Sequence, residues 1–168
     1  MAEFAYLERA EFDAYAEVLF GILADNMTKI APTGNTREED YRSWYGAVSD
    51  GLRSERRQIV LIRGAAGGEV VGFFQYYTNA ETFMMEEIQL IPAVQGSGIF
   101  RALYGFLMER LPRDIAYAEA YANRRNGKSQ GILRHLGLEV IGENKSGTSL
   151  HFRGEMRRLR EWMGRETS

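Results

Sequence analysis

The stretch that decides the fold is Glu86-Glu87-Ile88-Gln89-Leu90-Ile91-Pro92-Ala93-Val94-Gln95-Gly96-Ser97-Gly98-Ile99-Phe100-Arg101. Its first part predicts a strand over residues 82–91, which Pro92 ends because proline cannot donate to a sheet ladder. From Ile99 onward apolar side chains recur at helical spacing until Pro112, so a helix follows the glycine turn. A helix entered this way presents free backbone N–H groups and the positive end of its dipole. Such a place suits a phosphate.

Two segments resemble motifs of one enzyme family. Residues 95–98, Gln-Gly-Ser-Gly, after a strand ending in Ile-Pro, resemble motif A of the GNAT N-acetyltransferase superfamily, which cradles the pyrophosphate of acetyl-CoA. Residues 126–138, Asn-Gly-Lys-Ser-Gln-Gly-Ile-Leu-Arg-His-Leu-Gly-Leu, resemble the family's Asn-x-x-Ala-x-x-Leu-Tyr-x-x-Leu-Gly-Phe segment. The two blocks stand in the family's order with one strand between them. The resemblance, which covers residues 81–140, implies a GNAT-like N-acetyltransferase with acetyl-CoA as cosubstrate.

The resemblance also implies a set of CoA-binding residues. They lie at the end of the fourth strand, in the glycine turn, at the start of the next helix and in the second block: Leu90, Ile91, Gln95, Gly96, Ser97, Gly98, Ile99, Phe100, Arg101, Asn126 and Ser129. From the sequence alone Gly96 and Gly98 could merely shape a tight turn, and Asn126 could be a helix N-cap. No metal site is expected, because His135 and His151 have no carboxylate or histidine at ligand spacing.

Acyl transfer to an amine needs a base, an oxyanion-binding donor and an acid for the leaving thiolate. We predict Glu86 or Glu87 as the base, with Glu86 on the face of Ile88 and Leu90; two solvated carboxylates are the alternative. By resemblance the backbone N–H near Leu90 binds the oxyanion. The acid is predicted to be Tyr121, or Tyr104, although both could be packing residues.

Two positions depart from the family pattern. Phe100 stands where motif A has glycine or alanine, and Leu133 stands where many members have the tyrosine that protonates the thiolate. These two residues motivate an alternative function, a catalytically weakened CoA-binding sensor or interaction module of the same fold.

Composition bounds the remaining questions. The 168 residues fit one domain, 1–168, with 45% hydrophobic and 26% charged residues and a net charge of −2. This balance recruits neither nucleic acid nor an anionic membrane. The chain has no cysteine and no basic, apolar leader at its start, so we expect a cytoplasmic protein without disulfides.

The order of elements predicts an α/β (α+β mixed) GNAT-like fold. Its central sheet is mixed, mostly antiparallel, with six to seven strands, and about four helices plus a short C-terminal helix flank it. The sheet is expected to open between its fourth and fifth strands. Predicted strands are 4–7, 58–63, 70–77, 82–91, 115–120, 138–142 and 149–153; predicted helices are 11–24, one capped by Thr36 and Glu39, one from 99, 128–136 and one through Met156 and Met163.

Partners follow from surface chemistry. We predict a small-molecule or peptide amine as acceptor, although the acids that could attract it also suit helix starts: Asp25, Glu38, Glu39 and Asp40. Arginines 153, 157, 158 and 160 lack interleaved aromatics, which favours a solvated helix face over an RNA site. Trp162 and Met163 are expected to be exposed near the C-terminus, which suggests a partner surface, and a second copy of the chain is a candidate partner.

Overall fold

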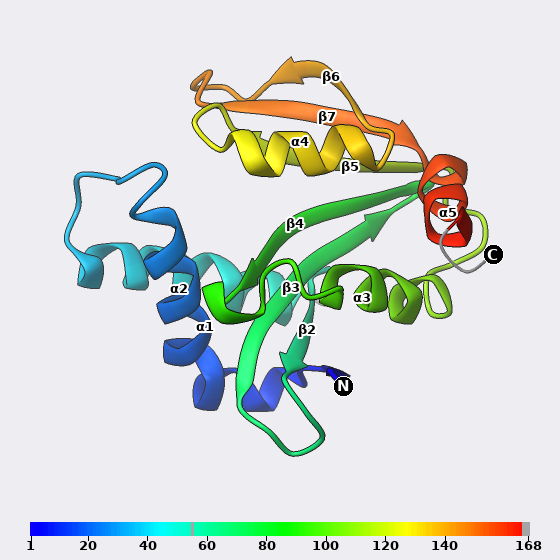
Figure 1. Ribbon diagram of the computed structural model, residues 1–168. Helices are drawn as coiled ribbons and strands as arrows, with labels where there is room; N and C mark the ends of the chain where they lie inside the picture. Colours follow the sequence, from blue (N-terminus) through cyan, green and yellow to red (C-terminus); the bar gives the residue numbers. More distant parts are fainter. Residues whose placement is uncertain (55, 166–168) are drawn as a thin grey trace. The chain divides into compact units, whose positions relative to one another are not determined.

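A computed structural model describes residues 1–54 and 56–165. These residues form seven strands, five α-helices and two short 3₁₀ helices (Figure 1). The order agrees with the prediction: β1 Glu3–Tyr6, α1 Phe12–Met27, α2 Arg37–Arg53, β2 Gln58–Arg63, β3 Val70–Asn79, β4 Thr82–Leu90, α3 Ile99–Met108, β5 Tyr117–Asn123, α4 Gly127–His135, β6 Glu139–Glu143, β7 Ser149–Glu155 and α5 Met156–Arg165. The 3₁₀ helices are Arg9–Glu11 and Pro92–Val94.

The strands form one mixed sheet in the order β1-β2-β3-β4-β5-β7-β6. The contacts group into two units. The first contains Met1–Tyr76 and Glu87–Ile99, and the second contains Tyr77–Glu86 and Phe100 onward. The expected single domain over residues 1–168 stays a prediction.

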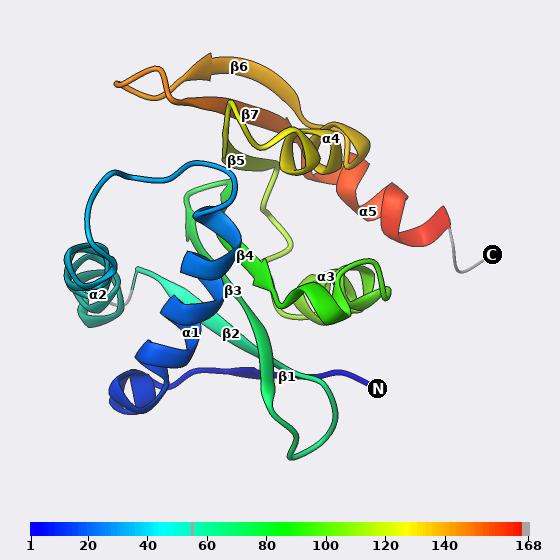
Figure 2. The same cartoon turned by 60° about the vertical axis from the view of Figure 1, so that its left-hand side comes forward.

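The core of the first unit lies under its two long helices. α1 and α2 contact each other and cross rather than run parallel (Figures 1 and 2), and both contribute to the core formed with the antiparallel strands β1, β2 and β3. Buried side chains from both helices meet those of the strands: Leu7, Phe12, Ala16, Leu19, Val48, Leu52, Ile59, Leu61 and Phe73. Trp44 and Tyr45 both pack on Phe12, with ring centroids 5.7 and 5.4 Å away. The predicted capping box is confirmed, since the Glu39 N–H donates to Thr36 Oγ1 and the Thr36 N–H donates to Glu39.

The second unit is built on β5. This strand pairs in parallel with the start of β4 and antiparallel with β7, and β7 pairs with β6. One face of β5 consists of buried alanines, Ala118, Ala120 and Ala122, which let helix α4 approach closely. α4 contributes the buried Leu133, and Gly137 ends the segment with a φ of 97° that favours glycine.

The β4–β5 ladder is shorter than either strand. It begins at Thr82↔Tyr117 and stops at Met85↔Ala120, whereas β4 continues to Leu90 and β5 to Asn123. The two strands therefore pair only over the start of each, and the sheet opening expected between the fourth and fifth strands stays a prediction.

Two predictions about the end of the chain and the fifth strand need correction. β5 begins and ends later than residues 115–120, so Tyr121 lies inside the strand. Trp162 is half-buried rather than exposed because it packs against Phe100 and Tyr104 of α3. The exposure of Trp162, which was the main reason to suggest a partner surface, is thus not found. A homodimer stays a prediction.

Candidate active site

The glycine turn before α3 has the geometry of an anion site. Gly96 and Gly98 have φ values of 77° and 87°, a region that favours glycine, and a Cβ at either would meet no atom within 4 Å. Ser97 is held inside the turn, since both its N–H and its Oγ donate to the Val94 carbonyl. The first-turn N–H groups of α3 follow directly at Ile99. The turn is therefore open in front of both glycines and leads directly into the first turn of α3.

The end of β4 is fixed by side-chain amides. The Leu90 carbonyl accepts from Asn26 Nδ2 at 2.9 Å and from Gln95 Nε2 at 3.0 Å, and the Ile91 N–H donates to the Val71 carbonyl at 2.9 Å. Gln95 therefore uses its side chain to hold the strand end. Asn26 was missed by sequence reasoning, because nothing in helix α1 points to a residue 64 positions later.

The two predicted bases have different surroundings. Glu87 accepts a hydrogen bond from Gln89 Nε2 at 2.6 Å, and Gln89 Oε1 accepts in turn from Asn26 Nδ2 at 2.9 Å. Strand alternation from Thr82 and Met84 places Glu86 on the opposite face from Glu87. Both carboxylates are half-buried. Glu87 is thus part of a hydrogen-bonded network that also holds the end of β4 through Asn26.

Phe100 and Arg101 turn toward α5. The Phe100 ring lies 4.7 Å from Tyr104 and 6.4 Å from Trp162, between ring centroids. Arg101 Nη1 donates to the carbonyl oxygens of Trp162 and Met163, at 3.2 and 3.1 Å. These side chains therefore pack between helices, and only their backbone N–H groups can serve a phosphate.

In the second block, Asn126 caps α4. Its side-chain oxygen accepts from the Ser129 N–H at 3.0 Å, so the predicted N-cap is confirmed. Asn126 remains half-exposed at the helix start, and its Nδ2 is the group that could meet a ligand.

The tyrosines predicted as acids differ in exposure. Tyr104 is fully buried and donates to Met85 Sδ at 2.9 Å; burial raises the pKa of its phenol well above the ordinary value. Tyr104 is therefore a packing residue. Tyr121 is 45% exposed and stacks on His151 with ring centroids 4.4 Å apart, so its hydroxyl can meet solvent or a ligand.

His151 is not isolated, contrary to the prediction. Its Nε2 lies 2.6 Å from Glu119 Oε1. The two residues are 32 positions apart and meet because β5 and β7 pair. His135, by contrast, is exposed on α4 as predicted. Within the described parts of the chain, no group of three or more His, Asp or Glu side chains could hold a metal ion.

Similarity to known proteins is structural. No family model and no curated protein matches the sequence. The PaiA N-acetyltransferase of Thermoplasma acidophilum, solved with coenzyme A, superposes with a TM-score of 0.71 at 15% identity, over 92% of this chain and 99% of that one. An acetyltransferase of Thermus thermophilus gives 0.68 at 17% identity, over 92% and 97%. The chain has the GNAT fold.

A third GNAT-fold structure is the spermidine N-acetyltransferase of Vibrio cholerae, solved with CoA and spermine. It superposes with a TM-score of 0.63 at 12% identity, over 95% of this chain and 98% of that one. All three structures match over at least 92% of this chain, so the fold predicted from the two motifs is confirmed.

Departures from the GNAT motifs have structural reasons in this chain. The Phe100 ring packs against Tyr104 and Trp162, so this side chain does not fill the glycine turn. Leu133 is buried with 7% of its surface exposed. Because leucine carries no polar atom, any proton for a leaving thiolate must come from elsewhere.

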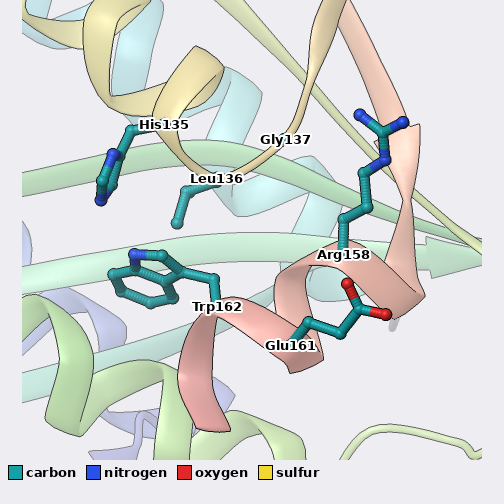
Figure 3. A pocket seen from close by; sticks show the side chains of 6 residues that line it. All are labelled: His135, Leu136, Gly137, Arg158, Glu161 and Trp162. Atoms are coloured by element: carbon teal, nitrogen blue, oxygen red, sulfur yellow. The ribbon is translucent and has the colours of Figure 1, made fainter. Parts of the chain in front are cut away.

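A small cavity lies beside this helix packing, at the end of α4. Its volume is about 200 Å³, and its lining comes from α4 and α5: His135, Leu136, Gly137, Arg158, Glu161 and Trp162 (Figure 3). Trp162 Nε1 is buried without a hydrogen-bond partner among the described residues. Arg158 points away from the indole in this view, so the polar side chains that line the cavity do not point toward one common position.

Across the same described residues, no helix is long and apolar enough to cross a membrane.

Proposed function

We propose that the protein is an N-acetyltransferase that moves an acetyl group from acetyl-CoA to a primary amine by direct attack in a ternary complex. The observation that carries this proposal is the open glycine turn at Gly96 and Gly98, placed between β4 and α3 of a GNAT fold. Other glycines, such as Gly34, are equally open and have a positive φ, but Gly96 and Gly98 stand directly before the first turn of α3, where a helix offers free N–H groups.

The CoA pyrophosphate would be bound by backbone groups. The Ser97 N–H is used by the Val94 carbonyl, so the N–H groups of Gly96 and Gly98 and those of the first turn of α3 would donate to the phosphates, and the helix dipole would add about 0.3–1 kcal/mol. Charge-assisted hydrogen bonds at about 1.5–3 kcal/mol each supply most of the affinity. Asn126 Nδ2 would donate to the pantetheine arm. Because backbone N–H groups would bind the phosphates, the side chains of Phe100 and Arg101 can point away from the turn without weakening this binding.

The chemistry would be direct. The amine nitrogen attacks the thioester carbonyl, the Leu90 N–H donates to the developing oxyanion, and the C–S bond breaks with its electron pair moving to sulfur. Glu86 would take a proton from the attacking nitrogen. Tyr121 is the exposed phenol that could give a proton to the thiolate.

The neighbours support an amine acceptor. One neighbour was solved with CoA and another with CoA and spermine. The four acids near α1 and α2 support no particular acceptor, because each is used locally: Asp25 pairs with Arg37, Glu38 pairs with Arg42, Glu39 closes the capping box, and Asp40 accepts from Thr33. We therefore propose a primary amine on a small molecule or peptide.

The second candidate function is a CoA-binding sensor, favoured by Leu133 and by the burial of Tyr104. One experiment separates the two. Mass spectrometry of the purified protein under non-denaturing conditions, together with thermal unfolding with CoA, tests binding; release of free CoA thiol with a panel of amines tests transfer. Binding with thiol release supports the enzyme, and binding without release to any amine supports the sensor. Absence of binding at millimolar CoA would contradict both.

A further inference from the structure

Four side chains form a polar cluster on the face of β5 and β7 opposite the buried alanines. Tyr121 and His151 are direct cross-strand partners, as are Glu119 and Arg153 (β5 and β7 lie together at the top of Figure 1). Directly opposite residues of an antiparallel pair project to the same side. His151 Nε2 lies 2.6 Å from Glu119 Oε1, and the Tyr121 ring stacks on the imidazole with an interplanar angle of 13°.

The cluster holds the imidazole in one orientation. The side chains of Glu119 and His151 are only 15% and 19% exposed, so their hydrogen bond is shielded from competing water. A carboxylate accepts hydrogen bonds only, so the neutral ring must carry its hydrogen on Nε2 and its lone pair on Nδ1. Nδ1 has no hydrogen-bond partner among residues 1–54 and 56–165, and it is not one of the buried unpartnered atoms. The lone pair therefore faces accessible space.

Space beside the ring is also open on the β6 side. The cross-strand partner of His151 on β6 is Gly142. A Cβ at Gly142 would meet no heavy atom within 4 Å. Tyr121 thus covers the ring on the β5 side, whereas the residue opposite His151 on β6 has no side chain.

The cluster stands where the β4–β5 ladder ends. The last pair is Met85↔Ala120, and Tyr121 is the next residue on β5. Glu86 is the next residue on β4, and strand alternation from Met84, the partner of Glu119, turns it to the face that carries Glu119, Tyr121 and His151. The side chains of Glu86, Tyr121 and His151 therefore project to the same face of their strands.

We propose that His151, positioned by Glu119, accepts the proton of the acceptor ammonium in the acetyl transfer. This inference rests on the proposed function and deepens it. The nitrogen of a primary ammonium loses two protons on becoming an amide. His151 Nδ1 takes the first and frees the lone pair; N–C bond formation and C–S cleavage follow. The second proton leaves after attack to Glu86, the thiolate takes one proton, and one proton passes to solvent.

The assignment of the two protons follows from acidity. An alkylammonium is a weak acid, so its proton needs the stronger base, and imidazole is a stronger base than a carboxylate. The nitrogen of the tetrahedral intermediate is far more acidic, and a carboxylate suffices there. The charged groups on this face nearest the imidazole are Glu119 and Arg153, whose Nε lies 3.9 Å from Glu119 Oε2. On β6, Gly142 stands opposite His151 and Glu139 stands opposite Arg153, and β4 adds Glu86. The Glu119 carboxylate is therefore the nearest charge to the imidazolium that forms.

Kinetics with matched variants test the proposal. His151→Gln should lower kcat/KM at neutral pH by about 10²–10⁴-fold, and the loss should shrink as the pH rises and the amine deprotonates unaided. Glu119→Gln should lower the rate less and shift the pH profile, because it acts through the imidazole. The thermal shift given by CoA should stay unchanged in both, which shows that they fold. His135→Gln, which alters the other of the two histidines, should behave as wild type.

NMR spectroscopy gives a readout independent of turnover. In His135→Gln a single imidazole remains, and its ¹⁵N shifts should show the Nε2–H tautomer; adding Glu119→Gln should remove that preference. An Nδ1–H tautomer, or wild-type kcat/KM in His151→Gln at neutral pH, would overturn the inference while leaving the transferase proposal standing. Lack of transfer by the wild type to any amine would overturn both.

Discussion

Arg101 places its guanidinium 4.1 Å from the centre of the Trp162 indole while donating to the carbonyl oxygens of Trp162 and Met163. One side chain of α3 thus satisfies backbone acceptors of α5, where helix carbonyls lack partners of their own. The indole in turn covers Phe100 and Tyr104. The packing of α5 on α3 therefore depends on Arg101, which lies only three positions after Gly98 of the glycine turn.

Arg101→Met should loosen α5. The change keeps most of the apolar stem but removes two charge-assisted hydrogen bonds and the cation–π contact, which should cost about 1–3 kcal/mol. Hydrogen exchange should accelerate over residues 156–165. Arg157→Met, on the same helix, removes only exposed pairs with Glu155 and Glu161 and should cost less than about 1 kcal/mol. Equal protection of α5 in both variants would contradict this role of Arg101.

Gly98→Trp should abolish CoA binding. CoA at a concentration 100 times its Kd should stabilise the wild type by about 2.7 kcal/mol. For a chain of this size, that free energy corresponds to a rise in Tm of about 5–10 °C. The indole would fill the open side of the turn. The matched control is Gly34→Trp, because Gly34 has a φ of 83° and equally open surroundings; it bears similar backbone strain but should keep the CoA shift. A shift retained in Gly98→Trp would place the phosphates elsewhere.

Glu86→Gln and Glu87→Gln should have different effects. If Glu86 takes a proton from nitrogen, Glu86→Gln should lower kcat by about 10²–10⁴-fold with CoA affinity unchanged. Glu87→Gln alters a hydrogen bond to Gln89, so it should affect stability more than turnover. Steady-state kinetics with the best acceptor decides between them, and a larger kcat loss in Glu87→Gln would reverse the assignment.

Leu133→Tyr should raise turnover without tightening CoA binding. If Leu133 occupies the position of the GNAT tyrosine, a phenol there reaches the leaving sulfur and supplies its proton. Leu133 is 7% exposed, so a larger ring costs about 1–3 kcal/mol of stability. Leu133→Phe adds the same ring without the hydroxyl and serves as the control. Equal kcat in the two variants would show that another residue donates the proton.

Tyr104 should make stability fall at alkaline pH. Burial raises the pKa of Tyr104 in the folded state above its ordinary value of 10.0, so the unfolded chain loses this proton first. Stability is therefore unaffected by this group below pH 10 and falls above it, by about 1.4 kcal/mol per pH unit. Thermal unfolding of the wild type and Tyr104→Phe between pH 8 and 11 measures the difference. Parallel pH dependence in the two proteins would contradict the assignment.

Local chemistry made much of the fold predictable. Thr36 and Glu39 cap a helix through contacts three residues apart, Asn126 caps another in the same way, and Gly137 ends it. The strand, glycine turn and helix around Gly96 and Gly98 are likewise contiguous. Such features depend on neighbours a few positions away, so the sequence alone determined the order of the elements and the position of the glycine turn, whereas the open space around its glycines was seen only in the structure.

Only the tertiary structure decided which distant side chains meet. Glu119 and His151 are joined by the register of β5 against β7, and a shift of one residue would turn every side chain to the other face. Neither strand specifies that register by itself, because it is set by packing against α4 and α5. The same holds for Arg101 and Trp162, 61 positions apart. The sequence thus determined the turn proposed to bind CoA, whereas the folded chain created the Glu119–His151 pair and the docking of α5.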